Sequence, residues 1–311
     1  MTKDRLVLHE VGPRDGLQVE KQTVPTGTKL EWIGKILASG IDIVQVGSFV
    51  HPEKVPQMAD TDELFRRLSA RPNAGSGVLS GLVLNEKGLD RALACGVSLV
   101  CMGISASDTH SRKNTGMGTE EATRRILAIA QKAVEADRAV QVSVQSAFGC
   151  GFEGPVPEER VLSIVKEYLG AGLTRISLAD TAGHAYPEQV ERLFETIVDL
   201  APDAEPACHF HDTFGLGMAN VWAAMRSGVV SFESSFAGLG GCPFTRVAAG
   251  NVATEDLVHG WQKSGRRLDV KLDVLIEVAR SVSAFFSREM PGRVYKTGPI
   301  PAERKIAEVP A

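Results

Sequence analysis

Short apolar runs alternate with amphipathic stretches along most of the chain. Eight of these runs have the length and composition of buried strands, and they lie at 6–12, 42–49, 80–84, 98–105, 140–148, 175–180, 206–212 and 231–236. Parallel strands covered by helices on both faces show such nearly continuous apolar runs. The pattern therefore predicts eight strands of one parallel sheet.

The stretches between the runs carry the periodicity of helices. Within 157–169 the apolar positions follow one helix face: Val161, Ile164, Val165, Tyr168 and Leu169. Pro157 suits the first turn of that helix, and the stretch 119–134 opens with acidic residues that favour a helix N-terminus. Eight strand–helix units at this length predict an α/β fold, a (β/α)8 TIM barrel. A doubly wound open sheet is the alternative, but no G-x-G-x-x-G motif follows the first run.

The chain ends outside these eight units. The apolar periodicity of 272–286 predicts an additional C-terminal helix, and three prolines in 292–311 indicate an extended tail. We therefore expect a catalytic barrel domain over 1–290 and a C-terminal tail over 291–311.

Composition and charge narrow the class of protein. The chain is 43% hydrophobic and 23% charged with a net charge of −4, which is typical of a globular enzyme and gives no basis for binding nucleic acid or an anionic membrane. No apolar run approaches the roughly 18 residues that span a bilayer. The five cysteines show no disulfide or zinc-finger spacing, and the N-terminus leads directly into a strand pattern. We expect a reduced, cytoplasmic protein.

Polar residues follow the carboxyl ends of the predicted strands, where barrels of this type place their active sites. In chain order these residues are Arg14, Asp15, Gln18, Gln45, Lys113, Asn114, Gln145, Asp180, His209, His211, Asp212, Cys242 and Asn251. The last two belong to a glycine-rich stretch after the eighth strand.

Four of these residues suggest a metal site. His209 and His211 are two positions apart on a strand, so both imidazoles point to one face. Together with Asp15 and Asn251 they offer a carboxylate, two imidazoles and an amide oxygen, which suit Mg²⁺ or Mn²⁺. Zinc would also accept the imidazoles and the carboxylate. The alternatives are two histidines hydrogen-bonded within the fold and an Asp15 that caps the following helix.

Four segments resemble one known family. "VGPRDGLQVEK", "GSFVHPEKVPQMAD", "HFHDTFGLGMAN" and "AGLGGCPFTRVAAGNVATEDLV" are similar to the 3-hydroxy-3-methylglutaryl-CoA lyases, which belong to the metal-dependent TIM-barrel lyases and Claisen synthases. The similarity runs from about residue 6 to residue 287. Related synthases carry a glutamate near Cys242, so the cysteine favours the lyase branch.

The resemblance implies an activity and roles for single residues. It implies cleavage of 3-hydroxy-3-methylglutaryl-CoA, or of a close analogue, to acetyl-CoA and a keto acid by a metal-dependent homodimer. Asp15, His209, His211 and Asn251 match the metal ligands, Arg14 matches an arginine that stabilises the enolate, and Cys242 matches a catalytic cysteine of a mobile loop. Asp15 or a metal-adjacent histidine would be the base. Supporting or substrate-binding positions are Gln18, Gln45, Asn114, Gln145, Asp180 and Asp256.

This chain departs from the family pattern at several positions. Gln45 stands where the lyases have a glutamate, Gln141 where they have an arginine, Ser143 where they have a tyrosine, and Gly151 where they have a proline. Gln145 is also bulkier than the site suggests. One hypothesis is that the chemistry is retained and the acyl group has changed, for example to a citramalyl-CoA-like thioester. The other is the ordinary lyase with a slower or retuned site. A metal-dependent aldolase or Claisen synthase and a catalytically silent scaffold remain alternatives.

Overall fold

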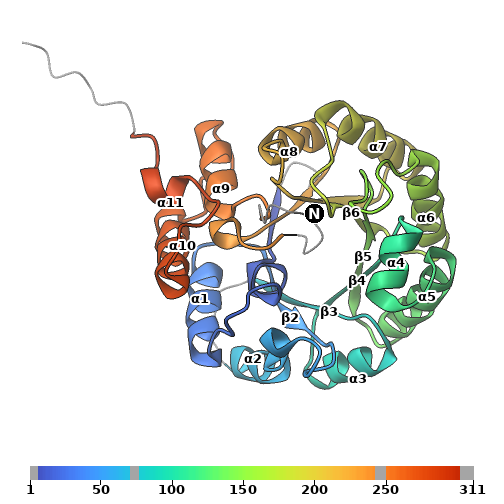
Figure 1. Cartoon of the computed structure of the whole chain (residues 1–311), viewed down its shortest axis with the longest axis horizontal. Helices are drawn as coiled ribbons and strands as arrows, with labels where there is room; N and C mark the ends of the chain where they lie inside the picture. Colours follow the sequence, from blue (N-terminus) through green and yellow to red (C-terminus); the bar gives the residue numbers. More distant parts are fainter. Residues whose placement is uncertain (1–5, 71–76, 242–249, 302–311) are drawn as a thin grey trace, which may run out of the picture.

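Eight parallel strands close into a barrel in chain order in the computed structural model (Figure 1). The structure describes residues 6–70, 77–241 and 250–301. The strands are β1 (Val7–Glu10), β2 (Ile43–Ser48), β3 (Val78–Leu82), β4 (Leu99–Ser105), β5 (Ala139–Gln145), β6 (Arg175–Asp180), β7 (Glu205–Phe210) and β8 (Ser231–Ser234). Each overlaps its predicted run, and β8 pairs with β1 to complete the ring. The predicted TIM barrel is confirmed.

Helices form the outer ring of the barrel (Figure 1). They are α1 (Thr26–Ala38), α2 (Thr61–Ser69), α3 (Glu86–Ala94), α4 (Asp108–Thr115), α5 (Thr119–Glu135), α6 (Glu158–Gly170), α7 (Pro187–Leu200), α8 (Gly217–Arg226), α9 (Thr254–Lys263), α10 (Leu272–Phe286) and α11 (Val294–Thr297). A π-helical turn, η1 (Gly12–Gly16), follows β1, and short 3-10 turns η2 (Pro56–Met58) and η3 (Phe236–Gly238) lie in loops. Within these segments, no helix is both long and apolar enough to cross a membrane.

The additional helix α10 occupies the predicted residues and packs beside α1. Trp32 of α1 donates its indole N–H to Ser281 Oγ of α10 over 3.0 Å, and the ring of Trp32 contacts Phe285 edge to face. The extended chain expected from residue 291 is wrong for Val294–Thr297, which form α11. The carboxylate of Asp256 in α9 accepts hydrogen bonds from the backbone N–H groups of Arg293 and Val294, which starts that turn.

The two faces of the strands differ in chemistry, and this difference creates the site. In β5 the valines 140, 142 and 144 are buried in the hydrophobic core beneath the helices. The alternating residues Gln141, Ser143 and Gln145 point into the barrel and line a cavity. The carboxyl half of the barrel interior is therefore polar, although its outer wall is apolar.

Candidate active site

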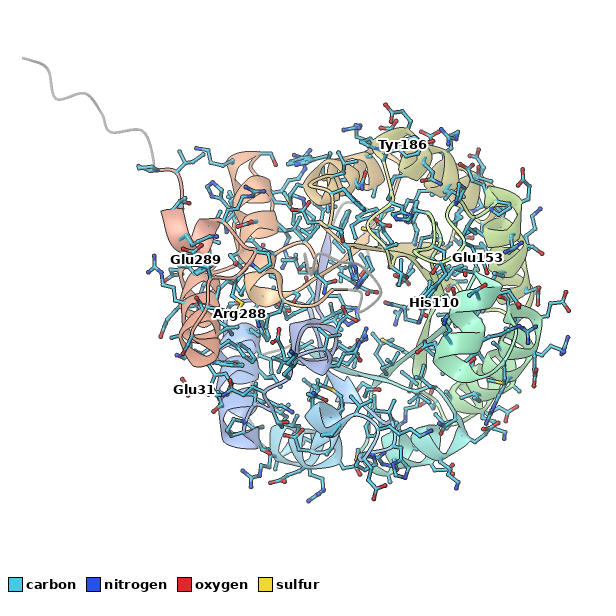
Figure 2. The ribbon with its side chains drawn as sticks, in the orientation of Figure 1. Glu31, His110, Glu153, Tyr186, Arg288 and Glu289 are labelled. Carbon is cyan, nitrogen blue, oxygen red and sulfur yellow. The ribbon has the colours of Figure 1, made fainter. Side chains whose placement is uncertain are left out.

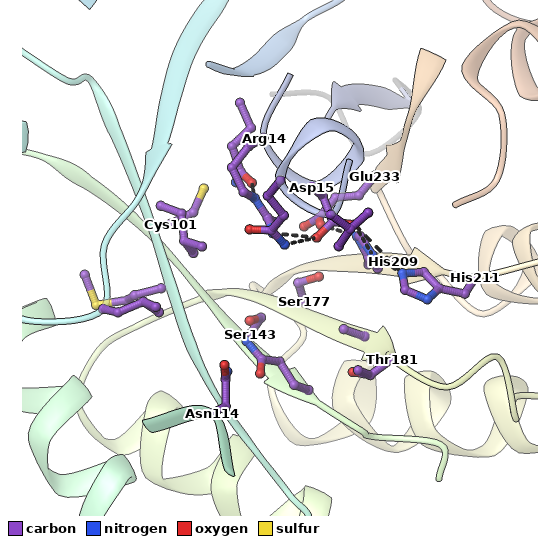
Figure 3. Close-up of a pocket in the computed structure, with 18 of the residues that line it drawn as sticks. Arg14, Asp15, Cys101, Asn114, Ser143, Ser177, Thr181, His209, His211 and Glu233 are labelled. Carbon is purple, nitrogen blue, oxygen red and sulfur yellow. Dashed lines mark hydrogen bonds and ion pairs between the residues drawn. The ribbon is translucent and has the colours of Figure 1, made fainter. Parts of the chain in front are cut away.

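A cavity of about 350 Å³ opens at the carboxyl ends of the strands. Its lining includes the predicted residues Arg14, Asp15, Gln18, Gln45, Asn114, Gln145, His209 and His211. Figure 3 shows the charged members of this set gathered on one side, where η1 approaches β7 and β8. The barrel thus brings residues almost two hundred positions apart into one site.

Asp15, His209 and His211 form a cluster that could hold a metal ion. One ligand atom from each residue lies within 4.8 Å of the others. Asp15 Oδ2 is 3.8 Å from His209 Nε2 and 3.9 Å from His211 Nε2. The two imidazoles share the inner face of β7, whereas the intervening Phe210 packs into the core against Phe148. The predicted orientation of the two histidines is confirmed.

Asn251 completes the cluster from the far end of the chain. An antiparallel β-bridge to His211 fixes the backbone of Asn251. The side-chain amide nitrogen of Asn251 donates to Asp15 Oδ2 over 2.8 Å and to the carbonyl of Leu239 over 2.9 Å. Its buried Oδ1 has no hydrogen-bond partner within the described part of the chain. An unpaired buried oxygen is costly unless a ligand satisfies it. The donor set therefore fits a divalent cation.

Neighbouring charges set the protonation of the cluster. Burial alone would raise the pKa of Asp15, but Arg14 first, and then His209 and His211, hold it well below its usual range. Burial, reinforced by His209, lowers the pKa of His211 to about 4. Asp15 is therefore ionised and His211 neutral near pH 7, which are the forms that bind metal.

Glu233 of β8 lies behind His209 and was missed by the sequence analysis. Its Oε2 is 2.9 Å from His209 Nδ1, and Gln141 Nε2 donates to its Oε1 over 2.7 Å. Burial alone would raise the pKa of Glu233, but the hydrogen bond and charge of His209 lower it to about 2. Burial would lower the pKa of His209, and the same contact raises it. The sequence does carry a signal for Glu233, because it is an acidic residue inside the apolar run 231–236 that predicts the eighth strand.

Two glutamines surround the arginine and the carboxylate of η1. Gln45 Oε1 accepts a hydrogen bond from Arg14 Nε, and Arg14 Nη1 donates to Asp15 Oδ1 over 2.5 Å. Gln18 Nε2 donates to the same Asp15 oxygen over 3.2 Å. Gln45 thus occupies a place where it can position Arg14 without adding a negative charge.

Two predicted carboxylates, Asp180 and Asp256, have structural partners away from the cavity lining. Asp180 ends β6, and its carboxylate accepts from the N–H groups of His184 and Ala185; burial raises its pKa to about 7. Asp256 holds α11, as described above, and neither carboxylate lines the cavity among the described residues. Their supporting roles stay predictions. Cys242 lies outside the described residues.

A (β/α)8 barrel with a carboxylate–imidazole cluster at the carboxyl ends of its strands defines a class of barrel enzymes. The HMGL-like family model matches residues 5–282, and the chain belongs to this family of lyases.

The similar proteins include lyases with two different substrates in their names. The chain is 34% identical to hydroxymethylglutaryl-CoA lyase YngG of Bacillus subtilis over 93% of the chain and 96% of that protein. It is 37% identical to (R)-citramalyl-CoA lyase of Chloroflexus aurantiacus over 96% of both proteins. A solved HMG-CoA lyase from Acinetobacter baumannii, in complex with coenzyme A and 3-methylmalate, superposes with a TM-score of 0.90 at 35% identity, covering 98% of this chain and 99% of that one.

Proposed function

We propose that the chain is a divalent-metal-dependent lyase that cleaves 3-hydroxy-3-methylglutaryl-CoA, or a close 3-hydroxyacyl-CoA analogue, to acetyl-CoA and a keto acid. The observation that carries this proposal is the position of Arg14. Its guanidinium donates to Asp15, which forms a possible metal cluster with His209 and His211, and Arg14 lines the same cavity. The named lyases among the similar proteins support the same reaction.

Asp15, His209, His211 and Asn251 would hold the ion, with Mg²⁺ or Mn²⁺ as the expected metals. When bound, the ion would lower the pKa of the substrate hydroxyl and fix its conformation. The bond that breaks joins C2, the carbon next to the thioester carbonyl, to C3, the carbon that bears the hydroxyl group. The chain's own residues have distinct tasks in breaking it.

Arg14 faces the charge that develops on the thioester. As the C2–C3 bond breaks, its electrons move toward the thioester carbonyl and the hydroxyl oxygen becomes a new carbonyl. A fixed guanidinium stabilises the resulting enolate oxygen without reorganising at the moment of reaction. The acetyl-CoA enolate then takes up a proton, and Cys242 is our expected donor.

The proton of the substrate hydroxyl needs an acceptor. The two candidates, Asp15 and His209, have pKa values that are shifted in opposite directions. Asp15 is a poor acceptor because Arg14 and the two histidines hold its pKa low. Glu233 raises the pKa of His209, but the same contact occupies Nδ1, and Nε2 faces Asp15 and the proposed ion. The base therefore stays an expectation shared by Asp15 and a metal-adjacent histidine.

A citramalyl-CoA-type substrate is the second candidate. Gln45 and Gln141 replace a charged pair of the family pattern with carboxamides that line the cavity, and a citramalyl-CoA lyase is among the similar proteins. The expected homodimer and cytoplasmic location stay predictions.

Acetyl-CoA release from both thioesters tests the proposal. The protein is stripped with EDTA, reloaded with Mg²⁺ or Mn²⁺, and assayed with each substrate. We expect cleavage of at least one thioester only in the reloaded protein. Asp15→Asn should weaken Mn²⁺ binding by about 100-fold or more and abolish cleavage, because it removes the charged ligand. Asp199→Asn, at an exposed position of α7, is the matched control. A folded, metal-loaded protein that releases no acetyl-CoA from either compound would contradict the proposal.

A further inference from the structure

The cavity has two unlike walls. Asp15, His209 and Glu233 lie on the wall formed by η1, β7 and β8, whereas Ser143 and Ser177 lie on the opposite wall formed by β5 and β6 (Figure 3). The charged wall is accounted for by the metal cluster and Arg14. The wall of short side chains has no role in the reaction described above.

The strand register aligns the short side chains in one row. Gly103 of β4 pairs with Ser143 of β5, and Ser143 pairs with Ser177 of β6. A Cβ atom on Gly103 would overlap the hydroxyl of Ser143, so this position of β4 contributes no side chain to the interior. From outside the barrel, the hydroxyl of Tyr168 donates to the Ser143 carbonyl over 3.1 Å and holds β5 in place. The Ser143 hydroxyl fills the place of a side chain at Gly103, so Ser143 and Ser177 are the short side chains of this row that line the cavity.

The groups around this space are polar and mostly neutral. Ser177 is fully buried, and its Oγ has no hydrogen-bond partner within the described segments. Gln141 uses its amide nitrogen on Glu233, which leaves its carboxamide oxygen as an acceptor at the end of the cavity. A buried hydroxyl without a partner indicates that a ligand atom completes its hydrogen bonding.

The charges disfavour a second carboxylate in this space. The carboxyl group of Glu233 lies at the floor of the cavity, and Gln141, which is hydrogen-bonded to it, presents an oxygen there as well. Arg14 is the only arginine or lysine among the described residues that line the cavity. Its guanidinium already binds Gln45 and Asp15. A hydroxyl can donate to Gln141 and accept from Ser177, so it matches both neighbours, whereas an alkyl group would leave Ser177 unsatisfied.

We propose that Ser143 and Ser177, with Gln141, form a sub-site for a short hydroxylated substituent on C3 of the acyl group. The inference rests on the proposed function and specifies its substrate class: a 3-hydroxyacyl-CoA with a hydroxymethyl-sized group where 3-hydroxy-3-methylglutaryl-CoA has a methyl group. The reaction is unchanged. The C2–C3 bond breaks, the 3-hydroxyl loses its proton and becomes a ketone, acetyl-CoA gains a proton at C2, and the keto acid retains the hydroxymethyl group.

Thioesters that differ only at C3 test the sub-site. The methyl, ethyl and hydroxymethyl compounds are prepared on the citramalyl-CoA and hydroxymethylglutaryl-CoA skeletons, and kcat/KM is measured on whichever skeleton the metal-loaded protein cleaves. Ethyl and hydroxymethyl have equal numbers of non-hydrogen atoms, so their ratio isolates the hydroxyl. We expect hydroxymethyl to exceed ethyl by about tenfold or more, because a buried polar group left unpaired discriminates strongly between substrates.

The Ser177→Ala variant provides a second test of the sub-site. The variant should reduce the ratio of hydroxymethyl to ethyl cleavage by about fivefold or more, mainly through KM for the hydroxymethyl compound. Ser163→Ala, at an exposed position of α6, is the matched control. Equal or greater cleavage of the ethyl compound, or an unchanged preference in Ser177→Ala, would overturn the sub-site while cleavage of the methyl compound still supports the proposed function. No cleavage of any compound would overturn the proposed function itself.

Discussion

Arg14 has one charged and one neutral neighbour. Its guanidinium donates to the Asp15 carboxylate on one side and to the Gln45 carboxamide on the other. A glutamate at position 45, which the resemblance to the lyases leads us to expect, would offset more of its positive charge. The carboxamide keeps the hydrogen bond and leaves the guanidinium charge available to a developing enolate.

Glu233 offers a sharp test at the residue scale. Glu233→Gln keeps the shape of the side chain and removes the charge that fixes His209 Nδ1. Partners behind a metal-binding histidine commonly change metal affinity by about 10- to 100-fold, so we expect a weakening of that size. Titration with Mn²⁺, followed by electron paramagnetic resonance, measures it. Glu195→Gln, exposed on α7, is the control, and an affinity equal to that of the parent would show that Glu233 does not act through His209.

At the scale of elements, α11 depends on a side chain from another helix. Val294 and Tyr295 are buried, and the first turn of α11 is held by Asp256 of α9. The short helix could not be predicted from its own sequence because four residues lack a full set of internal hydrogen bonds. Tertiary contact with α9 overrides the extended tendency of the proline-rich tail.

Asp256→Ala should therefore destabilise the C-terminal segment. The loss of the two acceptors should lower the free energy of unfolding by about 1–2 kcal/mol, the range for helix caps. Asp256→Asn retains a carboxamide oxygen and should cost less. Urea denaturation followed by circular dichroism measures the change for both variants. Equal stability of parent and alanine variant would show that α11 does not contribute to global folding.

At the scale of the whole molecule, two carboxyl groups are buried between β1, η3 and α9. Glu10 accepts from the N–H groups of Gly12 and Phe236 and from Thr254 Oγ1, and Glu255 accepts from the N–H of Ala237. Burial raises the pKa of Glu10 to about 7 and that of Glu255 to about 8. Glu10 joins β1 to η3 and α9, and Glu255 joins α9 to η3, so their protonation affects the stability of the closed barrel. Figure 2 shows the contrasting exterior, where charged side chains such as Glu31 of α1 and Glu289, after the end of α10, extend outward.

The sign of the resulting pH dependence follows from these pKa values. The folded state retains the Glu255 proton up to about pH 8, whereas the unfolded chain releases it near the ordinary value of 4.5. The stability contribution is complete below the unfolded pKa and is lost as pH rises through the folded pKa. Glu255→Gln should remove this loss. At pH 8.5 the free energy of unfolding of the variant should exceed that of the parent by about 1–3 kcal/mol, and at pH 5 the difference should be much smaller.

Urea denaturation across this pH range measures the effect. Glu135→Gln, exposed at the end of α5, should keep the slope of the parent. A Glu255→Gln variant whose stability falls with pH as steeply as that of the parent would show that another group causes the loss.

Much of the fold and part of the site could be read from local patterns. The apolar runs predicted all eight strands. The i, i+2 spacing placed His209 and His211 on one face, because successive side chains of a strand alternate between its two faces. The roles of Glu233 and Gln141 could not be read in this way. Their contact joins β5 and β8, 92 positions apart, and only the packing of the barrel interior decides that these two side chains meet.

Local chemistry therefore determined the elements, the barrel class and the identity of several polar residues that line the cavity. Barrel closure decided the rest. Asp15 and Asn251 are 236 positions apart and meet because β8 pairs with β1, which brings the loops at both ends of the chain to one mouth. The row of Gly103, Ser143 and Ser177 exists only because strand register aligns three small residues from different strands. Side-chain direction is a property of neighbouring residues, whereas register and closure depend on contacts made along the whole chain.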